Sequence, residues 1–81
     1  MPKLITPDEL CQRAADHTEA VLAAYGRPVR VTVTPEPDGA RIDAPCMVES
    51  TLAAKIGLAT GAAVSVDAYP ALGWSILHLR W

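Results

Sequence analysis

The chain has 81 residues, a formal net charge of −2 and a hydrophobic fraction of 51%. Its length fits one domain, residues 1–81, whose core alone gives a narrow margin of stability, so we expect a second copy or a partner to add buried surface. The acidic balance gives no general reason to bind nucleic acid or anionic lipid. No apolar run is long enough to span a membrane, and the N-terminal segment MPKLITPDEL carries prolines and acids where a signal peptide is apolar. We therefore expect a cytoplasmic protein.

The first predicted element is a helix with Thr6 as its N-cap. Pro7 suits the first helical position, and Glu9, three residues after Thr6, completes a capping box. Gly26 and Pro28 end the helix. Between these limits, small or apolar side chains form one stripe: Leu10, Cys11, Ala14, Ala15, Val21, Leu22 and Tyr25. We expect this stripe to pack against a sheet.

Two alternating segments follow and predict a β-hairpin. Residues 28–34, PVRVTVT, alternate valine with polar side chains, and residues 40–44, ARIDA, alternate in the same way. Residues 35–39, PEPDG, form a stiff connection rich in turn residues. This pattern places Arg30, Arg41 and Asp43 on the outward face.

Residues 50–66 predict a short helix, a glycine corner and a strand. The helix begins between residues 45 and 50, and we expect it to close at Gly57 with a left-handed residue. Leu58 then folds back as the apolar contact of that cap. Val64 and Val66 alternate as a strand should.

The C-terminal segment, residues 62–81, predicts a second hairpin with its turn at residues 69–73. The last strand is apolar on both faces, and such a strand is normally covered twice. Either the sheet curls into a barrel or a second molecule covers it. The resulting prediction is an α+β fold in the order α-β-β-α-β-β, a small curled antiparallel sheet or barrel with two helices, dimeric in solution.

The C-terminal two-thirds of the chain resembles the swapped-hairpin domains of the SpoVT-AbrB family, which includes MazE-type antitoxins. The family pattern is a strand, a turn, a strand ending in Arg-hydrophobic-x-hydrophobic-Pro, a short helix ending in Leu-Gly-hydrophobic, x-x-Gly, and two more strands. In this chain the pattern matches Val29 to Val33, Asp38-Gly39, Arg41 to Pro45, Leu52 to Leu58, Gly61, Val64 to Val66 and Ile76 to Arg80. The resemblance implies a homodimer with an interleaved barrel and, as an alternative function, a DNA-binding transcriptional regulator or antitoxin.

That alternative depends on basic side chains that could contact phosphate. Arg30, Arg41 and Lys55, with Arg27, make the only candidate patch. Residues 46–49, CMVE, hold no basic side chain where the family would contact phosphate, and the chain as a whole is acidic. We therefore expect DNA binding less than protein binding.

Cys46 is the strongest candidate for chemistry. It follows Pro45 near a helix N-terminus, where the dipole stabilises a thiolate, and either His17 or His78 could serve as its base. A thiol enzyme is therefore a distant third hypothesis. A small buried side chain at a strand-helix junction is the favoured interpretation, and Cys11 belongs to the core. The two cysteines indicate reduced thiols, and two isolated histidines indicate no metal site.

Large apolar and aromatic side chains gather along the terminal hairpin. They are Tyr69, Leu72, Trp74 and Trp81. Tryptophan and tyrosine often anchor protein interfaces, and the alternative is that they are the large members of an alanine-rich core. We expect them to form a dimer or partner contact.

Together these patterns predict a small non-enzymatic module that binds another protein and acts by occupying its surface. By class analogy, phage- or mobile-element-encoded inhibitors such as anti-CRISPR proteins are chains of this kind. We expect no cofactor, no metal and no membrane contact.

Overall fold

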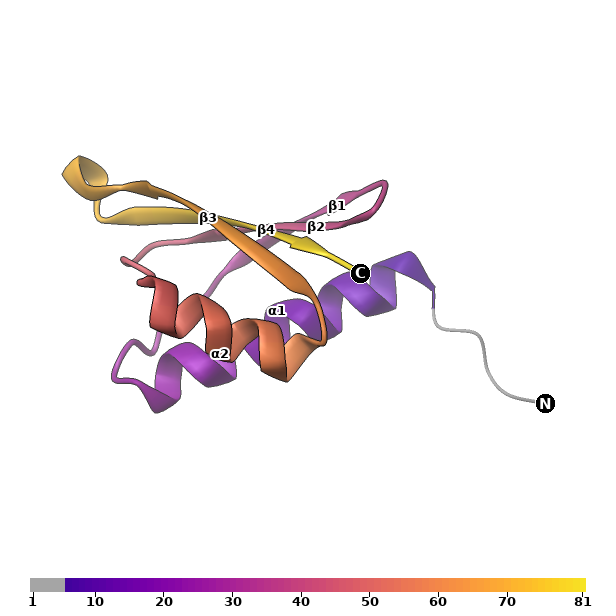
Figure 1. The fold of residues 1–81 in the computed structure, drawn as a ribbon, viewed down its shortest axis with the longest axis horizontal. Coiled ribbons are helices and arrows are strands. Elements are labelled where there is room, and N and C mark those ends of the chain that lie inside the picture. The colour runs from indigo at the N-terminus through magenta and orange to yellow at the C-terminus, as the bar shows by residue number, and fades with distance from the viewer. Residues whose placement is uncertain (1–5) are drawn as a thin grey trace.

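The computed structural model describes residues 6–81, so the first half of the segment used above against a signal peptide lies outside the described residues. Its elements are α1 (Pro7–Ala24), β1 (Thr32–Glu36), β2 (Gly39–Ala44), α2 (Ser50–Thr60), β3 (Ala63–Tyr69), the 3₁₀ turn η1 (Pro70–Leu72) and β4 (Trp74–Arg80). The four strands form one antiparallel sheet in the order β1-β2-β4-β3. Both helices lie on the same side of this sheet (Figure 1). The predicted α+β class and element order are confirmed.

Helix α1 begins as the capping pattern predicts. The Thr6 hydroxyl accepts a hydrogen bond of 3.2 Å from the Glu9 N–H. The buried stripe consists of Cys11, Ala14, Ala15, Thr18 and Leu22. Tyr25 does not belong to it, because it lies at the helix C-cap, where 51% of its surface is exposed.

The first hairpin is tighter than the sequence predicts. Strand β1 begins at Thr32 and includes Pro35 and Glu36, so only two residues, 37 and 38, connect it to β2. Pro35 can lie within the strand because β1 is at the sheet edge, where a missing N–H need not break the ladder. The predicted five-residue connection at 35–39 is therefore wrong.

The end of α2 also differs from the prediction. The helix runs through Gly57 to Thr60, and the left-handed C-cap is Gly61, with φ of 73°. The Gly61 N–H donates to the Gly57 carbonyl at 2.9 Å. Leu58 does not fold back, because 82% of its surface is exposed. Gly57 instead lies close to β3, where an added Cβ would be 3.1 Å from the Ala62 carbonyl oxygen.

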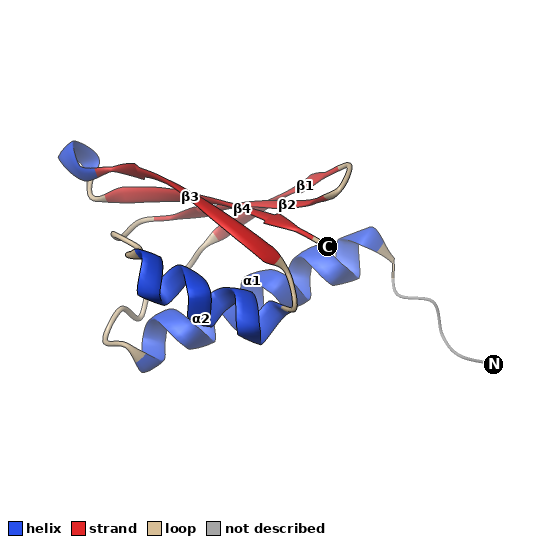
Figure 2. Ribbon diagram, viewed as in Figure 1, coloured by secondary structure: helices blue, strands red, loops and turns tan. Residues whose placement is uncertain are grey.

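The core lies between the sheet and the two helices. Its central side chains are Leu22, Ile42, Ile56, Leu77 and Leu79, each no more than 1% exposed. The sheet does not close into a barrel, because β1 and β3 are its two edges. The opposite sheet face carries no helix (Figure 2). Ile76 and His78 are half-buried on that face, alternating with the buried Ser75, Leu77 and Leu79.

Candidate interaction surfaces

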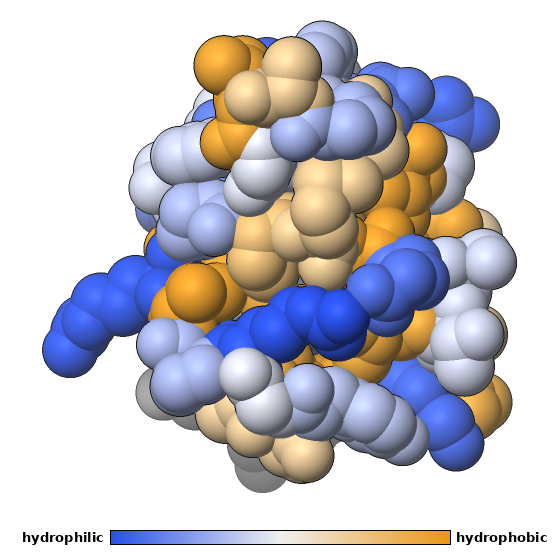
Figure 3. Space-filling model, turned by 90° about the vertical axis from the view of Figure 1, so that its left-hand side faces the viewer, coloured by the Kyte–Doolittle hydropathy of each residue, from blue (hydrophilic) through white to orange (hydrophobic). Residues whose placement is uncertain are grey.

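The β3–β4 hairpin extends beyond the helices and carries exposed apolar side chains at its end (Figure 1). Tyr69 and Trp74 are opposite partners on the two strands, and Leu72 lies in the turn between them. Their exposed fractions are 45% for Tyr69, 38% for Trp74 and 76% for Leu72. We call these three residues the hairpin tip. Figure 3, which faces this end of the molecule, shows apolar side chains at the top and a broader apolar area below, crossed by charged side chains.

Trp81, the fourth residue of the predicted interface, lies at the other end of β4. Residues 75–80 of β4 separate it from Trp74 of the hairpin tip, a distance of about 23 Å at the usual rise of a strand. Its N–H donates to the Asp38 carbonyl at 3.1 Å, and its side chain lines a cavity of about 200 Å³ together with His17. The prediction that Trp81 joins the other three in one cluster is wrong.

The predicted basic residues do not form one patch. Arg41 projects from the helix-free sheet face, where its Nε donates to the Asp43 carboxylate at 2.9 Å. This hydrogen bond, with the Asp43 charge, raises the pKa of Arg41. Lys55 is exposed on α2, which covers the opposite face, and Arg30 lies in the connection before β1. A single phosphate backbone would meet Arg41 and Lys55 on different sides of the molecule.

The helix-free face is polar along its middle. His78 Nε2 lies 3.3 Å from the Asp67 carboxylate on β3, and its Nδ1 lies 3.5 Å from the Glu36 carboxylate on β1. One side chain of β4 thus faces acids from both edge strands. Within residues 6–81, no three His, Cys, Asp or Glu side chains are grouped so that they could hold a metal ion.

Cys46 is half-buried and packs against the core. Burial raises the pKa of its thiol, Glu49 raises it further, and Arg27 lowers it. The Arg27 guanidinium forms an ion pair with Glu49, so the Glu49 charge partly offsets the lowering of the thiol pKa by Arg27. Neither histidine is beside Cys46: His78 is on the helix-free face, and His17 lines the cavity at Trp81. This environment favours the thiol over a nucleophilic thiolate.

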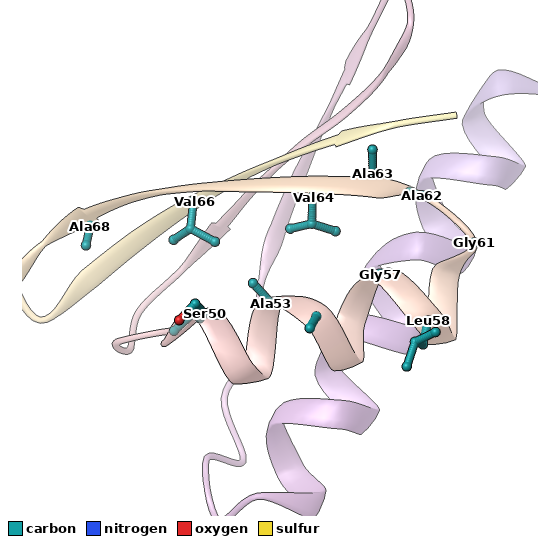
Figure 4. A pocket seen from close by; sticks show the side chains of 12 residues that line it. Ser50, Ala53, Gly57, Leu58, Gly61, Ala62, Ala63, Val64, Val66 and Ala68 are labelled. Carbon is teal, nitrogen blue, oxygen red and sulfur yellow. The ribbon is translucent and has the colours of Figure 1, made fainter.

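A groove of about 940 Å³ lies between α2 and β3 (Figure 4). Val64 and Val66 point from β3 towards α2, and Ala53 points from α2 towards the strand. The groove is lined by Val48, Ser50, Ala53, Ala54, Gly57, Leu58, Gly61, Ala62, Ala63, Val64, Val66 and Ala68. None of these side chains is charged. The sequence interpretation did not identify this surface, although the run of alanine and glycine in residues 53–63 indicates that helix and strand leave space between them.

Comparison with known proteins gives no match to a family model, to a curated protein or to a solved structure. The resemblance to SpoVT-AbrB domains therefore stays a prediction. Within the described part of the chain, no helix is long and apolar enough to cross a membrane.

Proposed function

We propose that this chain is a small non-enzymatic interaction module that acts by occupying a surface of another protein through its hairpin tip. The observation that carries the proposal is the exposure of Tyr69, Leu72 and Trp74 together at the end of a projecting hairpin. Exposed apolar side chains that cluster in this way mark interaction sites on soluble proteins. Aromatic side chains anchor such contacts because they bury large areas at little cost in side-chain entropy.

The geometry of the hairpin also favours binding to a partner. Tyr69 and Trp74 face each other across an antiparallel pair, and Gly73 closes the turn with φ of 61°. The backbone that carries the two rings is therefore ordered before binding, which lowers the ordering cost of association. Because the hairpin extends past α2, it can enter a concave surface without a clash from the helices. An inhibitor of the phage or mobile-element kind, such as an anti-CRISPR protein, would act by this type of obstruction.

A capture experiment tests the proposal. The tagged chain is incubated with lysate from its cells of origin, with and without nuclease, and bound proteins are identified by mass spectrometry. The Leu72→Asp and Trp74→Ala variants are compared with Tyr25→Ala, which removes an exposed aromatic ring away from the hairpin. We expect a stoichiometric protein that survives nuclease, is lost with both hairpin variants and is retained with the control.

Two results would contradict the proposal. One is a bound protein that all three variants retain equally. The other is recovery of nucleic acid that moderate salt releases, which would favour the DNA-binding alternative. Arg30, Arg41 and Lys55 give that alternative less support, because they lie on different sides of the molecule and Arg41 is already paired with Asp43.

A further inference from the structure

The edge of β3 and the groove beneath it form one continuous apolar surface that no other part of residues 6–81 covers. Val64 and Val66, on the inner face of β3, are only half-buried, and Ala68 is exposed. Leu58 borders the same groove and is 82% exposed. The backbone of β3 also has no partner strand on its outer side.

The two edges of the sheet differ in how well they resist pairing with another strand. Edge strand β1 has five residues and contains Pro35. Edge strand β3 has seven residues, contains no proline and no basic side chain, and pairs with β4 residue by residue from Ala63 to Tyr69 without a bulge. Proteins usually protect edge strands with proline, lysine or a bulge. Strand β3 lacks these features.

We infer that β3 pairs antiparallel with the β3 strand of a second copy, so that the two sheets join into one of eight strands. The central three residues of the strand, Val64-Ser65-Val66, read the same in both directions about Ser65. A two-fold axis at Ser65 places Ser65 opposite itself and each Val64 opposite the other copy's Val66. Valine then packs on valine at both inner positions, as a stable cross-strand pair requires.

The charge of Asp67 disfavours an alignment centred on that residue. Asp67 is the only charged residue of β3, and an axis at Asp67 would place two carboxylates opposite each other. With the axis at Ser65, Asp67 is opposite Ala63.

The groove beneath β3 has no charged side chain, so its best occupant is an equally neutral surface. The groove of a second copy meets this condition. Ala54 and Gly57 are small enough to let the two α2 helices approach.

The number of residues in the proposed dimer interface indicates the order of magnitude of the dimer affinity. The twelve groove residues, together with Ser65 and Asp67 of β3, make fourteen residues on each copy, and Tyr69 of the hairpin tip lies outside the paired segment. A standard stable interface uses about 20–30 residues a side, so we expect a dissociation constant on the order of micromolar. Antiparallel pairing directs the two hairpin tips to opposite ends of the joined sheet. The dimer therefore presents two partner-binding ends, and it forms whether or not the hairpin tip binds a partner.

The mass of the purified chain in solution tests this inference. Sedimentation is measured from about 1 to about 500 µM, a range that brackets the expected dissociation constant. Ser65→Lys places like charges opposite each other at the axis and should lower dimer affinity at least about tenfold. The matched control, Thr32→Lys, makes the same kind of change at an exposed position of the other edge strand. Leu72→Asp should leave the dimer unchanged, which separates this inference from the proposed function.

The alignment has its own test. In a Cys46→Ser background, Ser65→Cys should form a disulfide-linked dimer under mild oxidation, because opposite Cα atoms of an antiparallel pair are about 4.5–5.5 Å apart. Thr32→Cys should not form one. A chain that stays monomeric at all these concentrations would overturn the inference. A dimer that is insensitive to Ser65→Lys, or a groove that is filled only by a segment of the captured partner, would overturn it as well.

Discussion

Ser75 is fully buried, and its hydroxyl connects β4 to the segment before α2. It donates to the Cys46 carbonyl at 2.8 Å and accepts from the Val48 N–H at 3.0 Å. These two bonds satisfy a buried backbone N–H and a partly buried carbonyl. They position the start of α2, and therefore one wall of the groove.

We predict that Ser75→Ala lowers the free energy of unfolding by about 1–3 kcal/mol, because it leaves a buried N–H and a partly buried carbonyl without their hydrogen-bond partner. Urea unfolding followed by circular dichroism measures the change. Ser65→Ala, an exposed serine on the neighbouring strand, is the control and should change the free energy by less than about 0.5 kcal/mol. Equal effects of the two substitutions would show that the Ser75 bonds contribute nothing.

The Cys46 thiol allows a prediction about pH. Because burial raises its pKa above the ordinary value of 9.0, the folded chain favours the protonated form. The difference between the thiol pKa of the folded and the unfolded chain stabilises the folded state. This stabilisation is fully present below the thiol pKa of the unfolded chain and is lost as pH rises through the higher pKa of the folded chain. We expect iodoacetamide to modify Cys46 more slowly in the folded chain than in urea between about pH 6 and 9. Faster modification of the folded chain below neutral pH would instead support the thiol-enzyme hypothesis.

The β1–β2 hairpin depends on one close contact with β4. Gly39 follows the two-residue turn, and a Cβ at this position would collide with the Leu79 carbonyl. Glycine is therefore required here for close approach of two backbones, although its φ is ordinary. The same turn is held by the hydrogen bond from Trp81 to Asp38.

We predict that Gly39→Ala destabilises the chain by about 3 kcal/mol or more, because backbone atoms must move to admit the methyl group. Gly26→Ala is the comparison. Gly26 has φ of 80° with nothing near its added Cβ, so that substitution should cost about 1–2 kcal/mol from backbone strain alone. Thermal unfolding of the two variants measures the difference. A smaller effect at Gly39 than at Gly26 would contradict the close approach.

The sequence predicts elements better than it predicts how they meet. The cap at Thr6, both hairpins and the element order follow from local patterns that need no tertiary contact. The limits of β1 and α2 were missed because Pro35 is tolerated only at an edge, and because Gly57 serves close packing against β3. Both reasons depend on neighbours distant in sequence.

Sites are harder to predict for the same reason. Tyr69, Leu72 and Trp74 were identified because their residue types and turn position are visible locally. Trp81 was grouped with them by residue type alone, although the predicted last strand already places it a strand length from the turn. The groove was missed, because the small side chains of residues 53–63 indicate a groove only when the packing of α2 against β3 is known.

The molecule presents two separate apolar surfaces. The helices bury one sheet face, the other face is polar around His78, and apolar surface is left at the hairpin tip and at the β3 edge. The proposed division assigns the tip to a partner and the edge to a second copy. A dimer then binds a repeated partner more tightly than a monomer does, because the second contact becomes intramolecular.

That division predicts how Ser65→Lys affects partner capture. The variant keeps its hairpin tip but loses the dimer, so it should capture the same protein at lower avidity. The dissociation rate of each variant is measured from a surface that carries the immobilised partner at low or at high density. We expect the wild type to dissociate more slowly than Ser65→Lys only at high density. The same slow dissociation at both densities would show that the two surfaces do not cooperate.

The central claim, that the hairpin tip contacts a partner, is tested most directly by photo-cross-linking in the cells of origin. A benzophenone amino acid replaces Leu72 in one variant and Thr32, an exposed residue of the edge strand β1, in another. We predict one discrete protein adduct at position 72 and none at position 32, and the adduct should match the captured protein. No adduct at position 72, or the same adducts at both positions, would contradict the account.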